Sequence, residues 1–246
     1  GQVLSADEEA EWARVVNRFD VTAKKAHSLG VRLLIDAEES WMQDAVDKLV
    51  EQLMEKYNKE RAIVFTTVQL YRWDRMDYLR NLHKKAQDGG FKVGIKAVRG
   101  AYMEKENERA KEKGYASPIC PDKPATDTNF DEAIRYMLDD LDIFSIFAGT
   151  HNEESCYKLL EWMNADGIAV DDPRIWFGQL FGMSDHISFN LAERGYNVAK
   201  YLPFGPVRDV MPYLIRRAEE NTSVAGQTNR ELALLKKERK RRNLNE

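Results

Sequence analysis

The stretch IFSIFAGTHNEESCYKLLEWMNADGIAVDDPRIWFGQLFG (143–182) contains the pattern that decides the fold. It begins with a short apolar run (143–151), continues with an amphipathic segment and returns to a second apolar run (175–182). Short runs of nearly continuous apolar character are typical of strands that are buried on both faces. Between them, Asn152 is suited to cap the start of a helix and Gly167 to end it. The stretch therefore predicts a strand, a helix and a second strand.

The same alternation runs through the rest of the chain. Amphipathic helices are expected at 41–57 and 131–141, where apolar side chains recur at helical spacing. The segment from Glu8 to Leu29 has the pattern of a helix that leads into the first strand. Strands that alternate with helices predict an α/β fold with a parallel sheet. The apolar runs expected to form strands are VRLLIDA (31–37), AIVFTTVQLY (62–71), KVGIKAVRG (92–100), IFSIFAGTH (143–151), IWFGQLFG (175–182) and NVAKYLPFG (197–205).

Polar residues at the ends of nearly all the predicted strands favour a closed barrel over an open parallel sheet. An open sheet concentrates its functional residues at one switch point, whereas a (β/α)8 TIM-type barrel presents a ring of them. Because six of eight strands are found, we expect the first two strand–helix units to be absent. We also expect one domain over 1–246, in which 114–130 is a loop. The strand-end residues are Asp36, Gln69, Arg99, Thr150, His151, Gln179 and Tyr201.

Composition argues against several classes of protein. The formal charge of −4 lacks the basic excess that is usual in nucleic-acid-binding proteins. No apolar run approaches the roughly 20 residues of a membrane span, and the acidic first residues lack the features of a signal peptide. Cys120 and Cys156 have no spacing typical of a disulfide framework or a zinc site. No metal site is expected.

The segment most informative about function is YLPFGPVRDVMPYLIRRAEENTS (201–223). Its proline and glycine residues end a strand, and a helix is expected from about Asp209, with Pro212 in the first turn. Two guanidinium groups on one face of this helix can bind a carboxylate through bidentate, charged hydrogen bonds. The simpler alternative is an exposed, salt-bridged helix face. The residues that share this face at helical spacing are Tyr213, Arg216, Arg217 and Glu220.

Two further clusters lie at predicted strand ends. In KAVRGAY (96–102), the glycine lets the backbone approach a phosphate, and Lys96 and Arg99 offer cationic donors. THN (150–152) precedes a predicted helix N-terminus, where anions are favoured. Each signal is weak alone, and the dinucleotide and P-loop motifs are missing. Asp36, considered alone, is expected to be a helix N-cap.

Together these residues resemble the proline dehydrogenase family, which includes monofunctional enzymes and the first domain of bacterial bifunctional proline-utilisation proteins. The matching segments follow the family's order and spacing, and they cover nearly the whole chain from about residue 30. The family's first two strands have no counterpart. The resemblance implies an FAD-containing barrel whose last helix lies across the catalytic mouth. The segments are IDAEES (35–40), VQLY (68–71), VRGAY (98–102), THN (150–152), FGQLFGM (177–183), YLPFG (201–205) and YLIRRAEEN (213–221).

The resemblance also implies roles for individual residues. Asp36 and Lys96 match catalytic positions, and Lys96 stands where the bacterial bifunctional enzymes have arginine. The implied substrate-binding residues, two for the proline carboxylate and two for the pyrrolidine ring, are Arg216, Arg217, Tyr201 and Tyr213. The implied cofactor contacts are Gln69, Lys96, Val98, Arg99, Gly100, Thr150, His151 and Glu220.

The implied activity is oxidation of L-proline to Δ1-pyrroline-5-carboxylate, with hydride transfer to FAD and delivery of the electrons to a quinone. The chain most resembles the monofunctional, eukaryotic enzymes, which are mitochondrial, so a location on the matrix side of the inner membrane is expected. Because the family's electron acceptors are membrane quinones, peripheral membrane contact is expected as well. The basic run 236–242 is a candidate for that contact, and a solvated helix end is the alternative. Tyr201 would crowd a ring hydroxyl, which favours proline as substrate. The alternatives are a hydroxyproline dehydrogenase, a different barrel enzyme such as an aldolase, and a catalytically incomplete barrel fragment.

Overall fold

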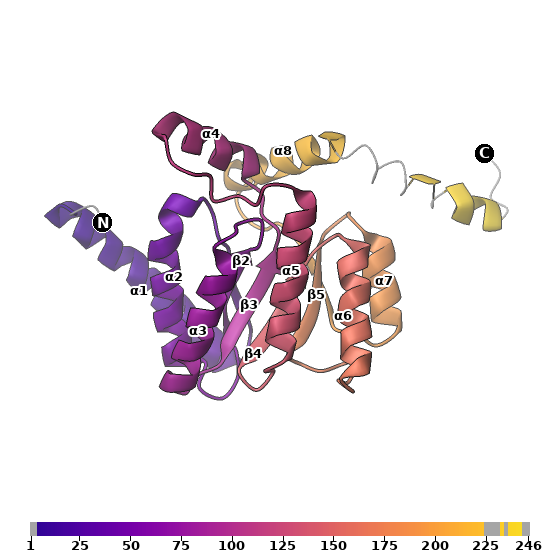
Figure 1. Ribbon diagram of the computed structural model, residues 1–246, viewed down its shortest axis with the longest axis horizontal. Coiled ribbons are helices and arrows are strands. Elements are labelled where there is room, and N and C mark those ends of the chain that lie inside the picture. Colours follow the sequence, from indigo (N-terminus) through magenta and orange to yellow (C-terminus); the bar gives the residue numbers. More distant parts are fainter. Residues whose placement is uncertain (1–3, 224–231, 234–235, 243–246) are drawn as a thin grey trace.

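A computed structural model describes residues 4–223, 232–233 and 236–242, and in this part six parallel strands alternate with helices (Figure 1). The strands lie in the sheet in sequence order. Each predicted apolar run contains a strand, so this prediction is confirmed, with strands shorter than the runs. They are β1 (Leu33–Ile35), β2 (Val64–Gln69), β3 (Val93–Val98), β4 (Phe144–Gly149), β5 (Ile175–Leu180) and β6 (Val198–Tyr201).

The helices begin and end where local capping chemistry permits. The side chain of Asn152 accepts the Ser155 N–H at 3.2 Å, and Gly167 follows the same helix with a φ of +66°, so both predictions for this helix are confirmed. The last helix begins at Val207, two residues before the predicted start, so the prediction that Pro212 lies in its first turn is wrong. The helices are α1 (Ala6–Leu29), α2 (Ser40–Tyr57), α3 (Arg75–Gly89), α4 (Met103–Lys113), α5 (Lys123–Leu138), α6 (Glu153–Ala165), α7 (Asp185–Glu193) and α8 (Val207–Ser223).

The loop predicted at 114–130 is wrong in its second half, because α5 begins at Lys123. The Asp122 carboxylate accepts the Ala125 N–H at 2.8 Å and caps the helix, and Pro124 lies in the first turn, where a missing N–H breaks no helical bond. Aspartate and proline are typical of turns, but the same residues also start helices.

The sheet curls toward a barrel, although β1 and β6 are not joined to each other in the described residues. Arg32, just before β1, donates a hydrogen bond to the Pro173 carbonyl at 2.5 Å, and its guanidinium lies 4.9 Å from the ring centroid of Trp176 on β5. β1 and β5 are not neighbours in the sheet, so this contact requires the sheet to bend back on itself. The predicted α/β class is confirmed: the described residues form a curled half-barrel of six parallel strands, and the complete (β/α)8 barrel stays a prediction.

The side chain of Asn58 fixes the amino ends of two strands to the end of α2. It is completely buried. Its Nδ2 donates to the carbonyls of Val64 and Lys92 at 2.8 and 3.0 Å, and its Oδ1 accepts the N–H groups of Ile63 and Val64 at 2.9 and 2.8 Å. One amide therefore satisfies four backbone groups at the bottom of β2 and β3.

Replacing Asn58 with alanine should destabilise the chain by roughly 3 kcal/mol, because several buried backbone groups lose their partners at once. Asn164→Ala, on an exposed position of α6, is the matched control and should change the free energy of unfolding by less than about 0.5 kcal/mol. Urea unfolding followed by circular dichroism measures both. Equal midpoints for the two variants would show that Asn58 has no such role.

Candidate active site

All five strand pairings are parallel, so the carboxyl ends of the strands lie at one edge of the sheet. α4 and α8 lie above this edge (Figure 1). The register pairs Thr67 with Lys96 and Gln69 with Val98. Since alternate residues of a strand share a face, these four side chains lie on one face of the sheet. The strand-end residues predicted from the sequence are thereby gathered along one edge.

Asp36 and Lys96 form an ion pair at this edge. Lys96 Nζ donates to Asp36 Oδ1, and Thr67 Oγ1 on the intervening strand lies 3.4 Å from the same oxygen. The Lys96 side chain is 18% exposed and that of Asp36 is 51% exposed. The expectation that Asp36 is a helix N-cap is wrong, because Glu39 occupies the N-cap position of α2. A half-exposed carboxylate held by an ammonium group is suited to contact a ligand.

A row without large side chains lies beside the ion pair. Val98 pairs with Gln69 on one side, and on the other side the row continues through Gly149 and Gly178, which pair with each other. A Cβ atom on Gly149 would lie 3.0 Å from Cγ1 of Val98 and 3.9 Å from Cε of Lys96. A Cβ atom on Gly178 would overlap the ring of Phe147, so this glycine makes room for a protein side chain. The row is therefore an apolar surface packed by Val98 and Phe147, and the Gln69 amide and the Lys96 amine belong to the same face of the sheet.

The loop after β3 requires glycine at position 100. Gly100 has a φ of +136°, and a Cβ atom there would lie 2.5 Å from the ring of Tyr71. The loop can therefore pass closely over this ring only without a side chain.

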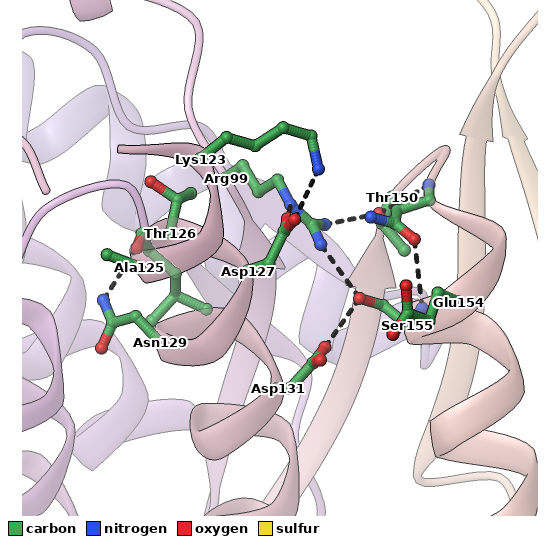
Figure 2. Close-up of polar contacts among 12 residues, drawn as sticks. Arg99, Lys123, Ala125, Thr126, Asp127, Asn129, Asp131, Thr150, Glu154 and Ser155 are labelled. Atoms are coloured by element: carbon green, nitrogen blue, oxygen red, sulfur yellow. Dashed lines mark hydrogen bonds and ion pairs between the residues drawn. The ribbon is translucent and has the colours of Figure 1, made fainter. Parts of the chain in front are cut away.

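Arg99 is held entirely by protein groups (Figure 2). Its guanidinium donates to Asp127 at 2.6 Å and to Thr150 Oγ1 and Ser155 Oγ at 2.9 Å each, and it lies 4.5 Å from the ring centroid of Phe130. These contacts connect β3 with α5, α6 and the end of β4. Arg99 and Thr150 were both predicted to contact a cofactor. The Arg99 carbonyl also accepts the Tyr71 N–H, and the Thr150 carbonyl accepts Nε2 of Gln179, so both residues are held by protein groups and their cofactor contacts stay predictions.

His151 is held in one tautomer. Its Nε2 accepts the Leu180 N–H at 3.5 Å, so Nδ1 carries the proton that it donates to Ser184 Oγ at 2.9 Å. Burial, with a smaller contribution from the cations of Lys200 and Arg217, lowers the pKa of His151 to about 4. The imidazole is therefore neutral at physiological pH.

α8 brings aromatic and cationic side chains to the same edge. The ring centroids of Tyr201 and Tyr213 lie 5.5 Å apart, and the Arg217 guanidinium lies 5.3 Å from the Tyr213 ring centroid. Arg217 also influences the pKa of His151, so it reaches the strand ends. The side chains of Arg216 and Glu220, which were predicted to share this face, lie outside the described residues.

Sequence reasoning missed polar residues that support the site from behind. Asp127 and Ser155 hold Arg99, and Lys200 donates to the Met183 carbonyl at 2.6 Å and to Ser188 Oγ at 3.0 Å. Asp127 lies in the segment predicted to be a loop. The sequence signal for such residues is a polar side chain at a position that should face the sheet. This signal can be recognised only where the helix or strand itself has been predicted.

Comparison with known proteins identifies related chains. The profile of the family "Proline dehydrogenase" matches residues 3–230. Human "Proline dehydrogenase 1, mitochondrial" is 41% identical over 235 residues, which is 94% of this chain and 39% of the human protein. "Hydroxyproline dehydrogenase" of Xenopus laevis is 38% identical over 247 residues, which is 99% of this chain and 53% of that protein. The structure of proline utilization A from Bdellovibrio bacteriovorus has a TM-score of 0.80 at 23% identity, covering 87% of this chain and 22% of that one.

The low pKa of His151 predicts a loss of stability in mild acid. The pKa of His151 has its ordinary value of 6.5 in the unfolded state and is about 4 in the folded state. As the pH falls through this window, the unfolded state binds the proton first, so acidification favours unfolding. His151→Gln removes this linkage. Between pH 7 and pH 5, the urea midpoint of the unaltered chain should therefore fall more than that of the variant. Equal falls would contradict the assignment.

Proposed function

The chain belongs to the proline dehydrogenase family, and we propose that it supplies the active site of an enzyme that oxidises L-proline to Δ1-pyrroline-5-carboxylate with FAD. The observation that carries the proposal is the position of Tyr201, Tyr213 and Arg217 at the edge that also holds the Asp36–Lys96 ion pair. A ring carboxylate with an amine needs a cation, a flat apolar surface and a carboxylate, and this edge has all three. The chain spans about two fifths of its human relative.

Arg217 binds the carboxylate of proline. A guanidinium offers two parallel donors that match the two carboxylate oxygens, and it stays charged at every physiological pH. Arg216 shares the carboxylate, as its helical spacing predicts. Tyr201 and Tyr213 pack against the pyrrolidine ring, because their rings are near neighbours and Tyr201 is 46% exposed before a ligand covers it.

Asp36 and Lys96 act on the amine side of the substrate. Oxidation of proline to an imine requires the ring nitrogen to lose its proton as C5 loses a hydride. A carboxylate oxygen of Asp36 accepts the nitrogen proton, and Lys96 holds that carboxylate in place through its ion pair.

The strand-end residues fit a flavin. The Gln69 amide and the Lys96 amine lie on one face of the sheet beside an apolar row and would supply hydrogen-bond donors to a bound flavin. Neutral His151, fixed in one tautomer, can contact a cofactor without adding a charge. When bound, FAD takes up the hydride from C5. The residues proposed to hold it are Gln69, Lys96, Val98, Arg99, Gly100, Thr150, His151 and Glu220.

Electrons then pass to a quinone, and we place the enzyme at the matrix side of the mitochondrial inner membrane. The human relative's name, with its word "mitochondrial", supports the compartment. In the described ranges no helix has the length and apolar character needed to cross a membrane. In the basic run at 236–242, Glu238 pairs with Arg241 and Arg242 at 2.7 and 2.6 Å. This internal pairing supports a solvated helix end as much as membrane contact.

Hydroxyproline is the second candidate substrate, favoured by the name of the Xenopus relative. Tyr201 supports proline instead, because a bulky phenol against the ring leaves little room for a hydroxyl group. The two substrates have the same carboxylate and amine, so Arg217 and Asp36 do not discriminate between them.

Purified full-length protein should have flavin absorbance, and L-proline should bleach it under anaerobic conditions. Because of Tyr201, trans-4-hydroxy-L-proline should bleach it more slowly, and kcat/KM for the two substrates measures the preference. A preparation that contains flavin but is not bleached by proline would contradict the proposed function. Faster turnover of hydroxyproline would instead transfer the assignment to that substrate.

Arg217→Met should raise KM for proline by about 100-fold, because two charged hydrogen bonds to the carboxylate are lost. Arg217→Lys should give an intermediate value, since lysine keeps the charge but lacks the planar fork. Arg208→Met is the control, because Arg208 is an exposed cation on the same helix. Steady-state kinetics measure all three, and an unchanged KM in Arg217→Met would contradict the role of Arg217.

A further inference from the structure

α4 holds the loop between β1 and α2 from outside the strand-end site. It follows β3 and lies above the N-terminal end of α2 (Figure 1). The consecutive residues 38–41 each contact a side chain of α4 or of its N-cap. These pairs are Glu38 with Tyr102, Glu39 with Lys105, Ser40 with Glu106, and Trp41 with Arg109.

Glu106 is the buried member of this set, with no exposed surface. Its carboxylate accepts the Ser40 N–H at 2.6 Å and the Ser40 O–H at 2.6 Å. α2 has no side-chain cap of its own, because the N-cap residue Glu39 makes no such hydrogen bond. Glu106 therefore caps α2 from another helix, and its negative charge lies where the helix dipole favours it.

Tyr71 connects Glu106 to the remaining strands. The ring of Tyr71 lies against Gly100, and the Tyr71 N–H donates to the Arg99 carbonyl at 2.7 Å. Burial raises the pKa of Tyr71, and the charge of Glu106 raises it further, so the two groups are close together. Glu106 thus lies where the ends of β1, β2 and β3 meet.

We propose that Glu106 is a positioning residue that acts through Asp36, an inference that rests on the proposed function. Three residues separate Asp36 from Ser40, so fixing Ser40 restricts where the Asp36 carboxylate can lie. Lys96 and Thr67 define one end of this short loop, and Glu106 defines the other. Without Glu106, the loop can move and Asp36 leaves the position it takes toward the substrate amine.

A double-mutant cycle in full-length protein tests this role. The rate of flavin reduction by saturating L-proline is measured in a stopped-flow instrument. Glu106→Ala should lower that rate by about tenfold, since small displacements of a reacting group are costly. In an Asp36→Ala background the same change should lower it by less than about twofold, because the group through which Glu106 acts is already gone. Glu104→Gln, at an exposed position of α4, is the charge-matched control and should leave the rate unchanged.

Equal losses in the two backgrounds would overturn the proposal and leave Glu106 a purely structural cap. If Glu106→Ala does not fold, the isosteric Glu106→Gln replaces it in the cycle, because its amide oxygen can still accept the Ser40 N–H. The rate of flavin reduction should then fall by about threefold, and this loss should disappear in the Asp36→Ala background. Hydrogen exchange at the Ser40 amide, which needs no substrate, should be about tenfold faster in Glu106→Ala, and unchanged exchange would also overturn the proposal. If proline does not bleach the flavin of the wild-type protein, that result would instead contradict the proposed function itself.

Discussion

Backbone hydrogen bonds between parallel neighbours bring the carboxyl ends of all six strands to one edge of the sheet. Residues that are distant in the sequence meet there because each strand contributes its last side chains to the same place. Asp36 reaches Lys96 across the width of β2, and Arg99 reaches Thr150 on the neighbouring strand. The site therefore depends on strand register more than on any single loop, since a shift of one residue would turn these side chains to the opposite face.

Two kinds of support hold this edge in shape. Behind the sheet, the Arg99 guanidinium connects α5 and α6 through Asp127 and Ser155. Above it, α4 holds the β1–α2 loop through Glu106 and its neighbours. Glu106 is fully buried and Arg99 is partly buried, and both charges are tolerated because each is met by several hydrogen bonds. The groups proposed to face the substrate, Asp36 and Tyr201, are about half exposed. The supporting residues are thus paired within the protein, whereas Asp36 and Tyr201 remain accessible to a ligand.

The sequence predicts features whose causes are local. Strands follow from short apolar runs, and α6 follows from its cap at Asn152 and its stop at Gly167. Features that depend on distant partners were missed. Asp36 has the sequence context of an N-cap, but it forms an ion pair with Lys96 instead, and Glu106 caps α2. α4 is so polar that its buried face is limited to Glu106 and Ala110, and no apolar periodicity identifies it. Family resemblance supplied what periodicity did not, and the roles of the site residues, including Arg216 and Glu220, stay predictions.

The central claim is that one edge of the half-barrel binds the substrate, with α8 contributing its carboxylate-binding group. The most direct measurement is a crystal structure of the full-length protein with FAD and a ring carboxylate that cannot be oxidised. The expected result is a carboxylate bound by Arg217, with the ring against Tyr201 and Tyr213 and its other side facing the Asp36–Lys96 ion pair. A ligand bound away from this edge, or with its carboxylate on other cations, would contradict the claim.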